Sequence, residues 1–244
     1  EPDYITAIKS QKDKEPFRLS NLKQDGSLGT YGNNNANFNA YFLVEDFNGY
    51  SGIKPRAYQD IIEVVGPANP TLWRMLNVKY IVVDKPVMFE GFVPILINEK
   101  TAVYKNENAL PRAYFVNKIE KKTPIEMLNT FKVSSIDPKD VAYVEEELKV
   151  DQPDSLATST IKEYKEAKTV VEVNASGNNF LFFGNTYHPG WKATIDGNET
   201  KVYKTNHGFM GIIIPAGKHI AEFNFAPESF FITKNIALAL SSLV

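Results

Sequence analysis

The sequence contains no cysteine, and this absence excludes several kinds of chemistry. A chain without thiols forms no disulfide, offers no thiolate nucleophile and cannot build a zinc site from cysteine ligands. Histidine is also scarce: the sequence has three, His188, His207 and His219. No two of them have the i,i+4 spacing of neighbours on a helix, and no pair of carboxylates accompanies them. We therefore expect no metal site and no cofactor, and we interpret these histidines as loop residues with satisfied hydrogen bonds.

The chain also lacks an excess of charge of either sign. It has 27 Lys and Arg against 29 Asp and Glu, which gives a net charge of -2. No run of basic residues stands out, so we expect no nucleic-acid partner. With 244 residues, 43% of them hydrophobic, the composition is that of an ordinary globular protein of one large domain or two smaller ones.

The sequence starts without an initiator Met and without a signal peptide. The opening Glu1-Pro2-Asp3 is polar, and we expect the chain to be an excised region of a longer protein. Residues 230–244 are apolar, but their uninterrupted part is shorter than the roughly 20 residues that a bilayer span needs. A terminal amphipathic helix or strand is one interpretation. We favour the other, the start of a truncated transmembrane helix with Lys234 at the headgroup level.

Residues 1–112 mix helix and strand signals and are interpreted as a mixed α/β subdomain. Residues 57–65 have apolar side chains at helical spacing and end at Gly66-Pro67, which is typical of a helix stop. Asn69-Pro70 predicts the cap of a second helix, and residues 25–39 predict a long loop rich in Gly and Asn. Strands are predicted at residues 17–20 and 79–84, and a hairpin at residues 94–98 and 101–105.

Strand signals dominate after Leu110-Pro111-Arg112, the predicted boundary. Residues 113–229 are expected to form a jelly-roll-like antiparallel β-sandwich, which makes the predicted fold class α+β. Thr123-Pro124-Ile125-Glu126 predicts a capping box that opens a short helix, and residues 151–159 predict an exposed loop. The expected strands are residues 113–119, 140–145, 169–174, 179–183, 191–196, 200–205, 209–214 and 219–225.

The segment at residues 187–197, YHPGWKATIDG, holds the first candidate binding residues. Tyr187 and His188 lie on its turn, where side chains are easily exposed, so they are candidate ligand contacts. Trp191 could stack on a sugar ring, but in a strand it shares a face with apolar residues, so we expect it in the core. Asp196-Gly197 is typical of a tight hairpin turn.

A second candidate site lies where the helix at residues 57–65 begins. Tyr50, Lys54, Arg56 and Tyr58 surround this helix start, and helix N-termini attract anions. Arg56 could hold a phosphate or carboxylate with two hydrogen bonds, so Arg56 and Tyr58 are candidate ligand residues. The alternative is an ordinary capped helix with Arg56 directed to solvent.

No catalytic residue is predicted. The run Glu145-Glu146-Glu147 could suggest glycosidase carboxylates, but adjacent residues of a strand point to opposite faces and cannot converge. No Gly-x-Ser-x-Gly elbow and no complete phosphate-binding loop is present. We interpret the three glutamates as a solvated strand end.

Four segments resemble, in order, the bacterial membrane protein family YfhO: residues 49–60, residues 76–82, LPRAY at residues 110–114, and the segment 187–197 together with PAGKH at residues 215–219. The resemblance runs from about residue 40 to the end of the chain. It implies a polytopic protein similar to the C-type glycosyltransferases, which use lipid-linked sugar donors. In such transferases the catalytic carboxylate lies in an early loop that this chain does not contain, so no catalytic role is carried over.

The resemblance implies a location on the periplasmic or extracellular side of the bacterial inner membrane. It further implies a non-catalytic domain that assists sugar transfer to cell-envelope glycans, with a lipid-linked sugar or envelope glycan as partner. Two alternatives stay open. Surface aromatics on the sandwich would favour a carbohydrate-binding module of an exported protein, and a large exposed apolar patch would favour a structural or partner-binding ectodomain.

Overall fold

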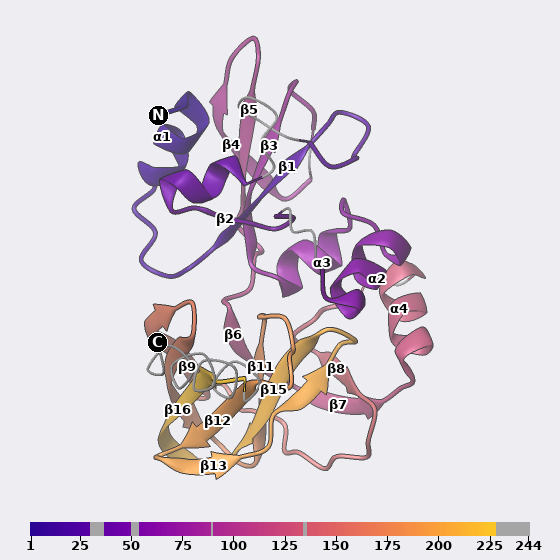
Figure 1. Cartoon of the computed structure of the whole chain (residues 1–244), viewed down its shortest axis with the longest axis vertical. Helices are drawn as coiled ribbons and strands as arrows, with labels where there is room; N and C mark the ends of the chain where they lie inside the picture. Colours follow the sequence, from indigo (N-terminus) through magenta and orange to yellow (C-terminus); the bar gives the residue numbers. More distant parts are fainter. Residues whose placement is uncertain (30–36, 50–53, 89, 134–135, 228–244) are drawn as a thin grey trace, which may run out of the picture.

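In a computed structural model of the chain, the residues described are 1–29, 37–49, 54–88, 90–133 and 136–227. Within them the chain forms three β-sheets, and helices pack between and around these sheets (Figure 1). Three sequence predictions fall outside the described residues: the run of three asparagines in the loop 25–39, Tyr50 beside the helix start, and the expected transmembrane segment at residues 230–244.

The first sheet is mixed and has the strand order β2-β1-β3-β5-β4. Its strands are β1 (Arg18–Leu22), β2 (Glu45–Asp46), β3 (Val78–Val83), β4 (Phe92–Ile97) and β5 (Ala102–Asn106). β1 pairs in parallel with both β2 and β3, whereas β5 pairs antiparallel with β3 and β4. The central β3 is buried on both faces, as its continuous apolar run predicts, and the predicted hairpin is β4–β5.

The helices are α1 (Asp3–Lys9), α2 (Arg56–Val64), α3 (Pro70–Met75), α4 (Pro124–Val133) and the 3₁₀ helix η1 (Phe38–Phe42). α1, for which no prediction was made, covers one face of the mixed sheet with Ile5 and Ile8. α2 and α3 are the two helices predicted there. The cap of α3 is confirmed, because the Asn69 side chain accepts a hydrogen bond from the Leu72 amide at 3.1 Å.

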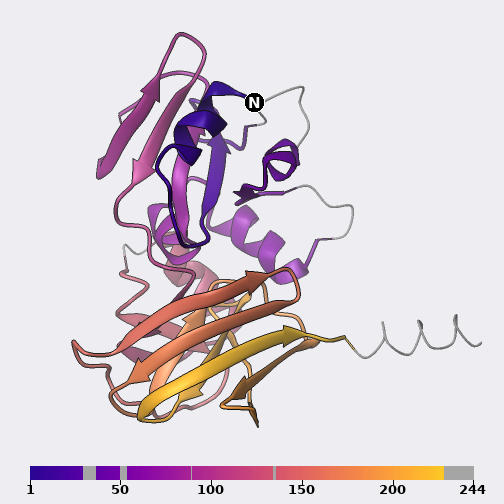
Figure 2. The same ribbon diagram turned by 90° about the vertical axis from the view of Figure 1, so that its left-hand side faces the viewer.

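The other two sheets pack face to face as a β-sandwich, which confirms the α+β class (Figure 2). The sheet with order β13-β12-β16-β10-β9 holds β9 (Thr158–Lys165), β10 (Lys168–Ala175), β12 (Trp191–Ile195), β13 (Asn198–Thr200) and β16 (Gly217–Phe225). The sheet with order β6-β11-β15-β14-β8-β7 holds β6 (Ala113–Val116), β7 (Lys118–Lys121), β8 (Val141–Val144), β11 (Asn179–Phe183), β14 (Tyr203–Thr205) and β15 (Phe209–Ile214). Buried apolar side chains from both sheets, such as Val173, Phe183, Ile212 and Phe223, form the core between them.

Two strand predictions and one loop prediction needed correction. Residues 113–119 form two strands, β6 and β7, at opposite edges of one sheet, because the chain turns at Asn117. Residues 200–205 divide between β13 and β14, which belong to different sheets. The predicted loop 151–159 ends in β9, an edge strand that its polar residues concealed. One pair in the sandwich, β7 with β8, is parallel rather than antiparallel.

A layer of helices joins the mixed sheet to the sandwich. α2, α3 and α4 lie against the outer face of the six-stranded sheet (Figures 1 and 2), and one apolar cluster runs through this layer. Its members come from both sides of residue 112: Leu72 and Met75 of α3 pack in the same cluster as Tyr114, Phe182 and Phe209. The division into domains at residue 112 stays a prediction, but the two regions share this core.

Candidate functional site: a polar cleft between the mixed sheet and the sandwich

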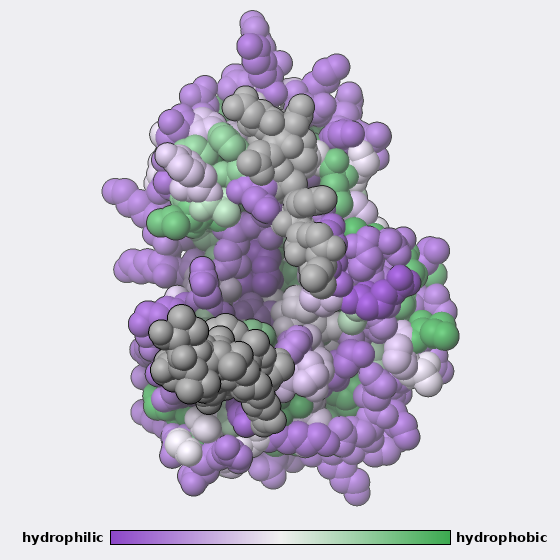
Figure 3. All heavy atoms as spheres, viewed as in Figure 1, coloured by the Kyte–Doolittle hydropathy of each residue, from purple (hydrophilic) through white to green (hydrophobic). Residues whose placement is uncertain are grey.

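A cleft with a volume of about 650 Å³ lies between the mixed sheet and the sandwich. Figure 3 shows it as a hydrophilic hollow between the two halves of the molecule. One wall comes from β1, β2, η1 and α2, and the other from the end of β9, the turn after it and the segment after β11. The lining residues are Arg18, Asn37, Ala40, Leu43, Val44, Glu45, Asp46, Phe47, Gly49, Tyr58, Tyr164, Lys165, Glu166, Asn185 and Thr186.

Arg112 anchors the base of the cleft from just before β6, with a side chain that is fully buried. Both of its terminal nitrogens donate to Oε2 of Glu45 at 2.9 Å. Nη1 also donates to the Tyr164 hydroxyl at 2.7 Å and to Oδ1 of Asn185 at 3.1 Å, and Nε donates to Asn77 Oδ1 at 3.3 Å. A buried guanidinium is tolerated only when its donors are satisfied in this way. Arg112 therefore ties β2 to the sandwich.

Arg18 lies beside Arg112 and makes a second set of bridges. Its Nη1 donates to the backbone carbonyls of Leu76 and Gly184 at 2.9 and 2.8 Å, and Nη2 donates to Asn185 Oδ1 at 3.3 Å. Its Nε is 3.6 Å from Glu45 Oε2. We call Arg18, Glu45, Arg112, Tyr164 and Asn185 the arginine cluster. The cluster holds two cations and one carboxylate, so it leaves a net positive charge at the base of the cleft.

The electrostatics of the arginine cluster keep Glu45 ionised. Burial acts to raise the pKa of the Glu45 carboxyl, but the positive charges of Arg112 and Arg18 outweigh it, so this pKa lies below its ordinary value. Burial lowers the pKa of Arg112 to about 10, with a further lowering from Arg18. Arg112 thus stays charged at neutral pH. Because Glu45 is a stable carboxylate, it can accept hydrogen bonds but is a poor proton donor.

Asp46, the next residue of β2, lies in a different environment. Burial raises the pKa of Asp46, and three donated hydrogen bonds partly oppose this shift. Asn39 and Asn21 donate to Oδ2 at 2.7 and 3.1 Å, and the Asn48 amide donates to Oδ1 at 2.9 Å. These bonds occupy the carboxyl group, so its oxygens mainly fix η1 and the loop after β2 in place.

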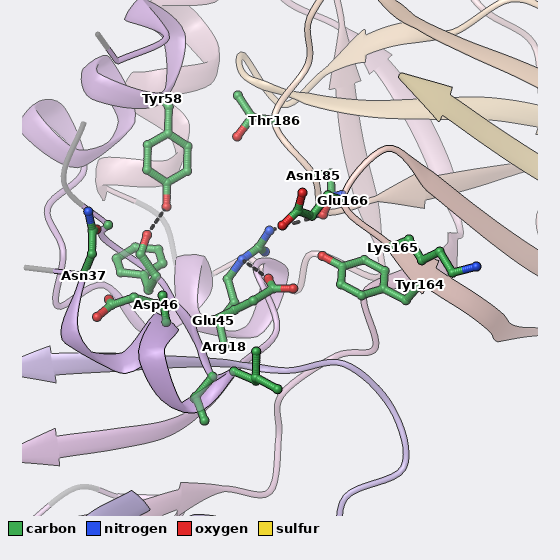
Figure 4. Close-up of a pocket in the computed structure, with 15 residues that line it drawn as sticks. Arg18, Asn37, Glu45, Asp46, Tyr58, Tyr164, Lys165, Glu166, Asn185 and Thr186 are labelled. Carbon is green, nitrogen blue, oxygen red and sulfur yellow. Dashed lines mark hydrogen bonds and ion pairs between the residues drawn. The ribbon is translucent and has the colours of Figure 1, made fainter. Parts of the chain in front are cut away.

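Two tyrosines stand on opposite sides of the cleft, with Arg18 and Glu45 between them (Figure 4). Tyr58 projects from α2, and its hydroxyl donates to the Phe47 carbonyl. Tyr164 projects from β9, and its ring lies 5.1 Å from the guanidinium carbon of Arg112. Burial raises the pKa of Tyr58 to about 12 and also raises the pKa of Tyr164, so both remain neutral phenols. The cleft thus combines aromatic surface with fixed donors and acceptors.

Arg56 and Tyr58, the two candidate ligand residues at the start of α2, point to different places. Tyr58 is one of the residues that line the cleft. The Arg56 side chain is 81% exposed, and its Nε forms an i,i+4 ion pair with Asp60 at 2.6 Å. The other oxygen of Asp60 lies 3.1 Å from Nε2 of His207. Arg56 therefore points to solvent on the surface of α2, as in the alternative interpretation of this helix start.

The candidates in the turn before β12 lie just beyond the edge of the cleft. Asn185 and Thr186 line the cleft, and Tyr187 and His188 follow them directly. Tyr187 is half-buried against the sandwich core, whereas His188 is exposed and accepts a hydrogen bond from the Gly190 amide at Nδ1, 2.9 Å away. Trp191 packs against the sandwich core, with its ring 5.2 Å from that of Phe225.

Two further predictions concern groups elsewhere in the sandwich. Asp196 and Gly197 have φ values of 51° and 82° and form the predicted hairpin turn between β12 and β13. Of the three histidines, His207 is buried and His219 lies in a strand, with its Nδ1 2.6 Å from Asp196 Oδ2. Across the part of the chain that the structure describes, no group of three His, Asp or Glu side chains is placed to hold a metal ion.

Sequence reasoning missed most of the arginine cluster. Arg112 lies within the LPRAY segment at residues 110–114, which indicates a domain boundary and contributes to the family resemblance but does not indicate a binding site. Arg18, Glu45, Tyr164 and Asn185 carry no local motif. The available signal was Arg112 itself, because a charged residue next to the apolar strand Ala113–Val116 needs a partner if it is buried.

A comparison with protein families matches part of the chain to one family. The family model described as "Bacterial membrane protein YfhO" matches residues 128–237. Over this region the chain is similar to the YfhO family. No significant match to the chain was found among curated proteins or among solved structures.

The YfhO match contains one wall of the cleft, from Tyr164 to Thr186, whereas Arg18, Glu45 and Arg112 precede it. The description of the YfhO family as bacterial membrane proteins supports a membrane location for this chain. No helix of the described residues has the length and apolar character needed to cross a bilayer.

Proposed function

We propose that this chain is an extracytoplasmic, non-catalytic part of a YfhO membrane protein, and that its cleft holds the sugar of a lipid-linked donor or of a cell-envelope glycan during sugar transfer. The observation that carries this proposal is the polar, tyrosine-lined cleft of about 650 Å³ between the mixed sheet and the sandwich. Junctions between structural units are common places for small-molecule sites.

The chemistry of the cleft suits a sugar. Hydroxyl groups both donate and accept hydrogen bonds, and the cleft offers acceptors at Glu45 and Glu166 and donors at Lys165 and Thr186. The ring of Tyr164 offers aromatic surface for the apolar face of a pyranose. Arg112 donates hydrogen bonds to Glu45 and Asn185. The base of the cleft is therefore preorganised for binding.

The same geometry favours binding over catalysis. Glycoside chemistry needs one carboxyl group that donates a proton and a second that acts across the bond. Glu45 is held ionised by two arginines. Burial raises the pKa of Asp46, but its oxygens are occupied by hydrogen bonds from Asn21, Asn39 and the Asn48 amide and are not directed at a ligand. We therefore assign the chemical step to another part of the protein.

The alternative, a carbohydrate-binding face on the sandwich, has less support. The outward-facing side chains of β16 and β10 include Lys218, Ile220, Glu222 and Glu172, with no aromatic ring among them. Tyr187 and Trp191 pack partly against the sandwich core. These described strands thus present no aromatic platform.

Isothermal titration calorimetry with bacterial envelope oligosaccharides, preceded by a glycan array to select them, tests the proposal. Ala40 lines the cleft and is exposed, so Ala40→Trp should obstruct the cleft and weaken or abolish binding without disturbing the fold. Ala68→Trp is the matched control, because Ala68 is exposed and lies outside the cleft. Sugar binding that survives Ala40→Trp would place the site elsewhere, and the absence of binding to every oligosaccharide would favour a structural or partner-binding role.

A further inference from the structure

The 3₁₀ helix beside the cleft ends in an apolar tip. Tyr41 and Leu43 are 83% and 95% exposed. The ring of Phe42 lies 5.0 Å from that of Tyr41 and 5.2 Å from that of Phe38, so three rings gather next to the leucine. We call Phe38, Tyr41, Phe42 and Leu43 the η1 tip.

The η1 tip has a strained backbone and exposes apolar side chains to water, and both features are energetically unfavourable. Leu43 has a φ of 60°, in the left-handed region that bulky residues rarely adopt. The neighbouring Asn39 is buried and bridges two groups: it accepts from the Tyr4 hydroxyl at 2.8 Å and donates to Asp46 at 2.7 Å. A strained, solvent-exposed leucine on a firmly anchored helix indicates a surface that is covered during function.

The position of the η1 tip indicates what covers it. Figures 1 and 2 show η1 and the end of β16 on the same face of the molecule, and Figure 3 shows apolar surface around η1 beside the cleft on that face. The sequence after β16 is apolar over residues 230–244, and the YfhO family consists of membrane proteins. The polypeptide therefore leaves the sandwich on this face and continues into a sequence that favours lipid.

We propose that the η1 tip docks on the surface of a lipid bilayer, with Tyr41 and Leu43 entering the interface between headgroups and acyl chains. Tyrosine suits this interface because it has an apolar ring and a polar hydroxyl. The ammonium group of Lys9 lies 5.7 Å from the Phe42 ring centre and forms an ion pair with Glu1 at 2.8 Å, so the apolar side chains of the tip carry the contact. Docking of this kind sets the orientation of the cleft relative to the membrane.

The lack of cysteine makes a direct test possible. Leu43→Cys and, as a control, Ile125→Cys in α4 each introduce a single attachment site for an environment-sensitive dye. Both native side chains are largely exposed, and α4 lies away from the face that carries η1. With vesicles of phosphatidylglycerol and phosphatidylethanolamine, the dye at position 43 should shift to the blue and brighten, and the dye at position 125 should not change.

The strength of the contact is measured by vesicle flotation of the same chain. Leu43→Ser should weaken vesicle partitioning about tenfold, the effect expected for one buried leucine side chain, and Ile125→Ser should leave it unchanged. A silent dye at position 43, or equal responses at both positions, overturns the proposal. A response at position 43 that depends on protein concentration without vesicles also overturns it, because a second copy of the chain would then cover the tip.

Discussion

At the scale of single residues, Arg112 determines whether the cleft can form. It is fully buried, and its donors reach β2, β9 and the segment after β11, three places far apart in the sequence. Loss of one partner of a buried ion pair is costly because the other charge remains desolvated. The Glu45 side chain is 40% exposed, so water relieves part of this penalty.

We predict that Arg112→Met lowers the free energy of unfolding by roughly 2–3 kcal/mol, measured by urea denaturation. Arg56→Met is the matched control, because Arg56 is 81% exposed and its i,i+4 pair contributes only a few tenths of a kcal/mol. Adding Glu45→Gln to Arg112→Met should recover part of the loss, since it removes a carboxylate that has lost its closest cation and keeps only Arg18, at 3.6 Å. Equal effects of Arg112→Met and Arg56→Met would show that the arginine cluster is not coupled to folding.

At the scale of elements, the hairpin turn between β12 and β13 is fastened to β16 by Asp196. One oxygen of this side chain accepts from the Ile220 amide at 2.8 Å, and the other lies 2.6 Å from Nδ1 of His219. The hydrogen bond to Asp196 raises the pKa of His219 above its ordinary value of 6.5, and the same bond lowers the pKa of Asp196 below 3.8. The contact is therefore strongest between these two ordinary values.

The direction of the pH effect follows from the two shifts. The contribution of His219 is complete below pH 6.5 and is lost as the pH rises through its raised pKa, whereas that of Asp196 is lost only as the pH falls below 3.8. We predict that the urea midpoint falls from pH 6 to pH 8 and that Asp196→Asn flattens this fall. Asn tolerates the φ of 51° and still accepts from Ile220.

A second turn-forming aspartate provides the control for this pH profile. Asp154 accepts from the amides of Leu156 and Ala157 without a histidine partner. Asp154→Asn should therefore retain the wild-type dependence on pH. If Asp196→Asn retains it as well, a group other than the Asp196–His219 pair is responsible.

Elements defined by neighbouring residues could be predicted from the sequence. The Thr123 amide donates to Glu126 Oε2 at 2.7 Å, and the Glu126 amide donates to Thr123 Oγ1 at 3.4 Å, as the capping box predicts. The Asp196-Gly197 turn was found for the same reason. β9 was missed because an edge strand with polar side chains on one face gives little apolar alternation.

The cleft could not be predicted in the same way. Arg112 and Glu45 are 67 positions apart, and Arg112 and Asn185 are 73 apart. Nothing in the local pattern of either residue identifies its partner, because long-range pairing depends on how the sheets pack. Of the four candidate ligand residues, Tyr58 lines the cleft, and Tyr187 and His188 follow its edge.

At the scale of the whole molecule, the apolar cluster that crosses residue 112 couples the two regions. Separating them would expose Tyr114, Phe182 and Phe209, which are all buried. We predict that hydrogen exchange of β3, in the mixed sheet, and of β11, in the sandwich, reports the same opening free energy with the same dependence on urea. A clearly lower value for one sheet would instead support two independently unfolding domains divided near residue 112.

The central position of β16 has a mechanical consequence. β16 is paired on one side with β10, from Asn224 opposite Lys168 to Gly217 opposite Ala175, and on the other side with β12. Ladder hydrogen bonds run across the strands, so a force applied along β16 after Phe225 loads both ladders in shear and all their bonds share it. When the protein is pulled from this end, the hydrogen bonds of both ladders should therefore break together at one high force rather than one after another at low force.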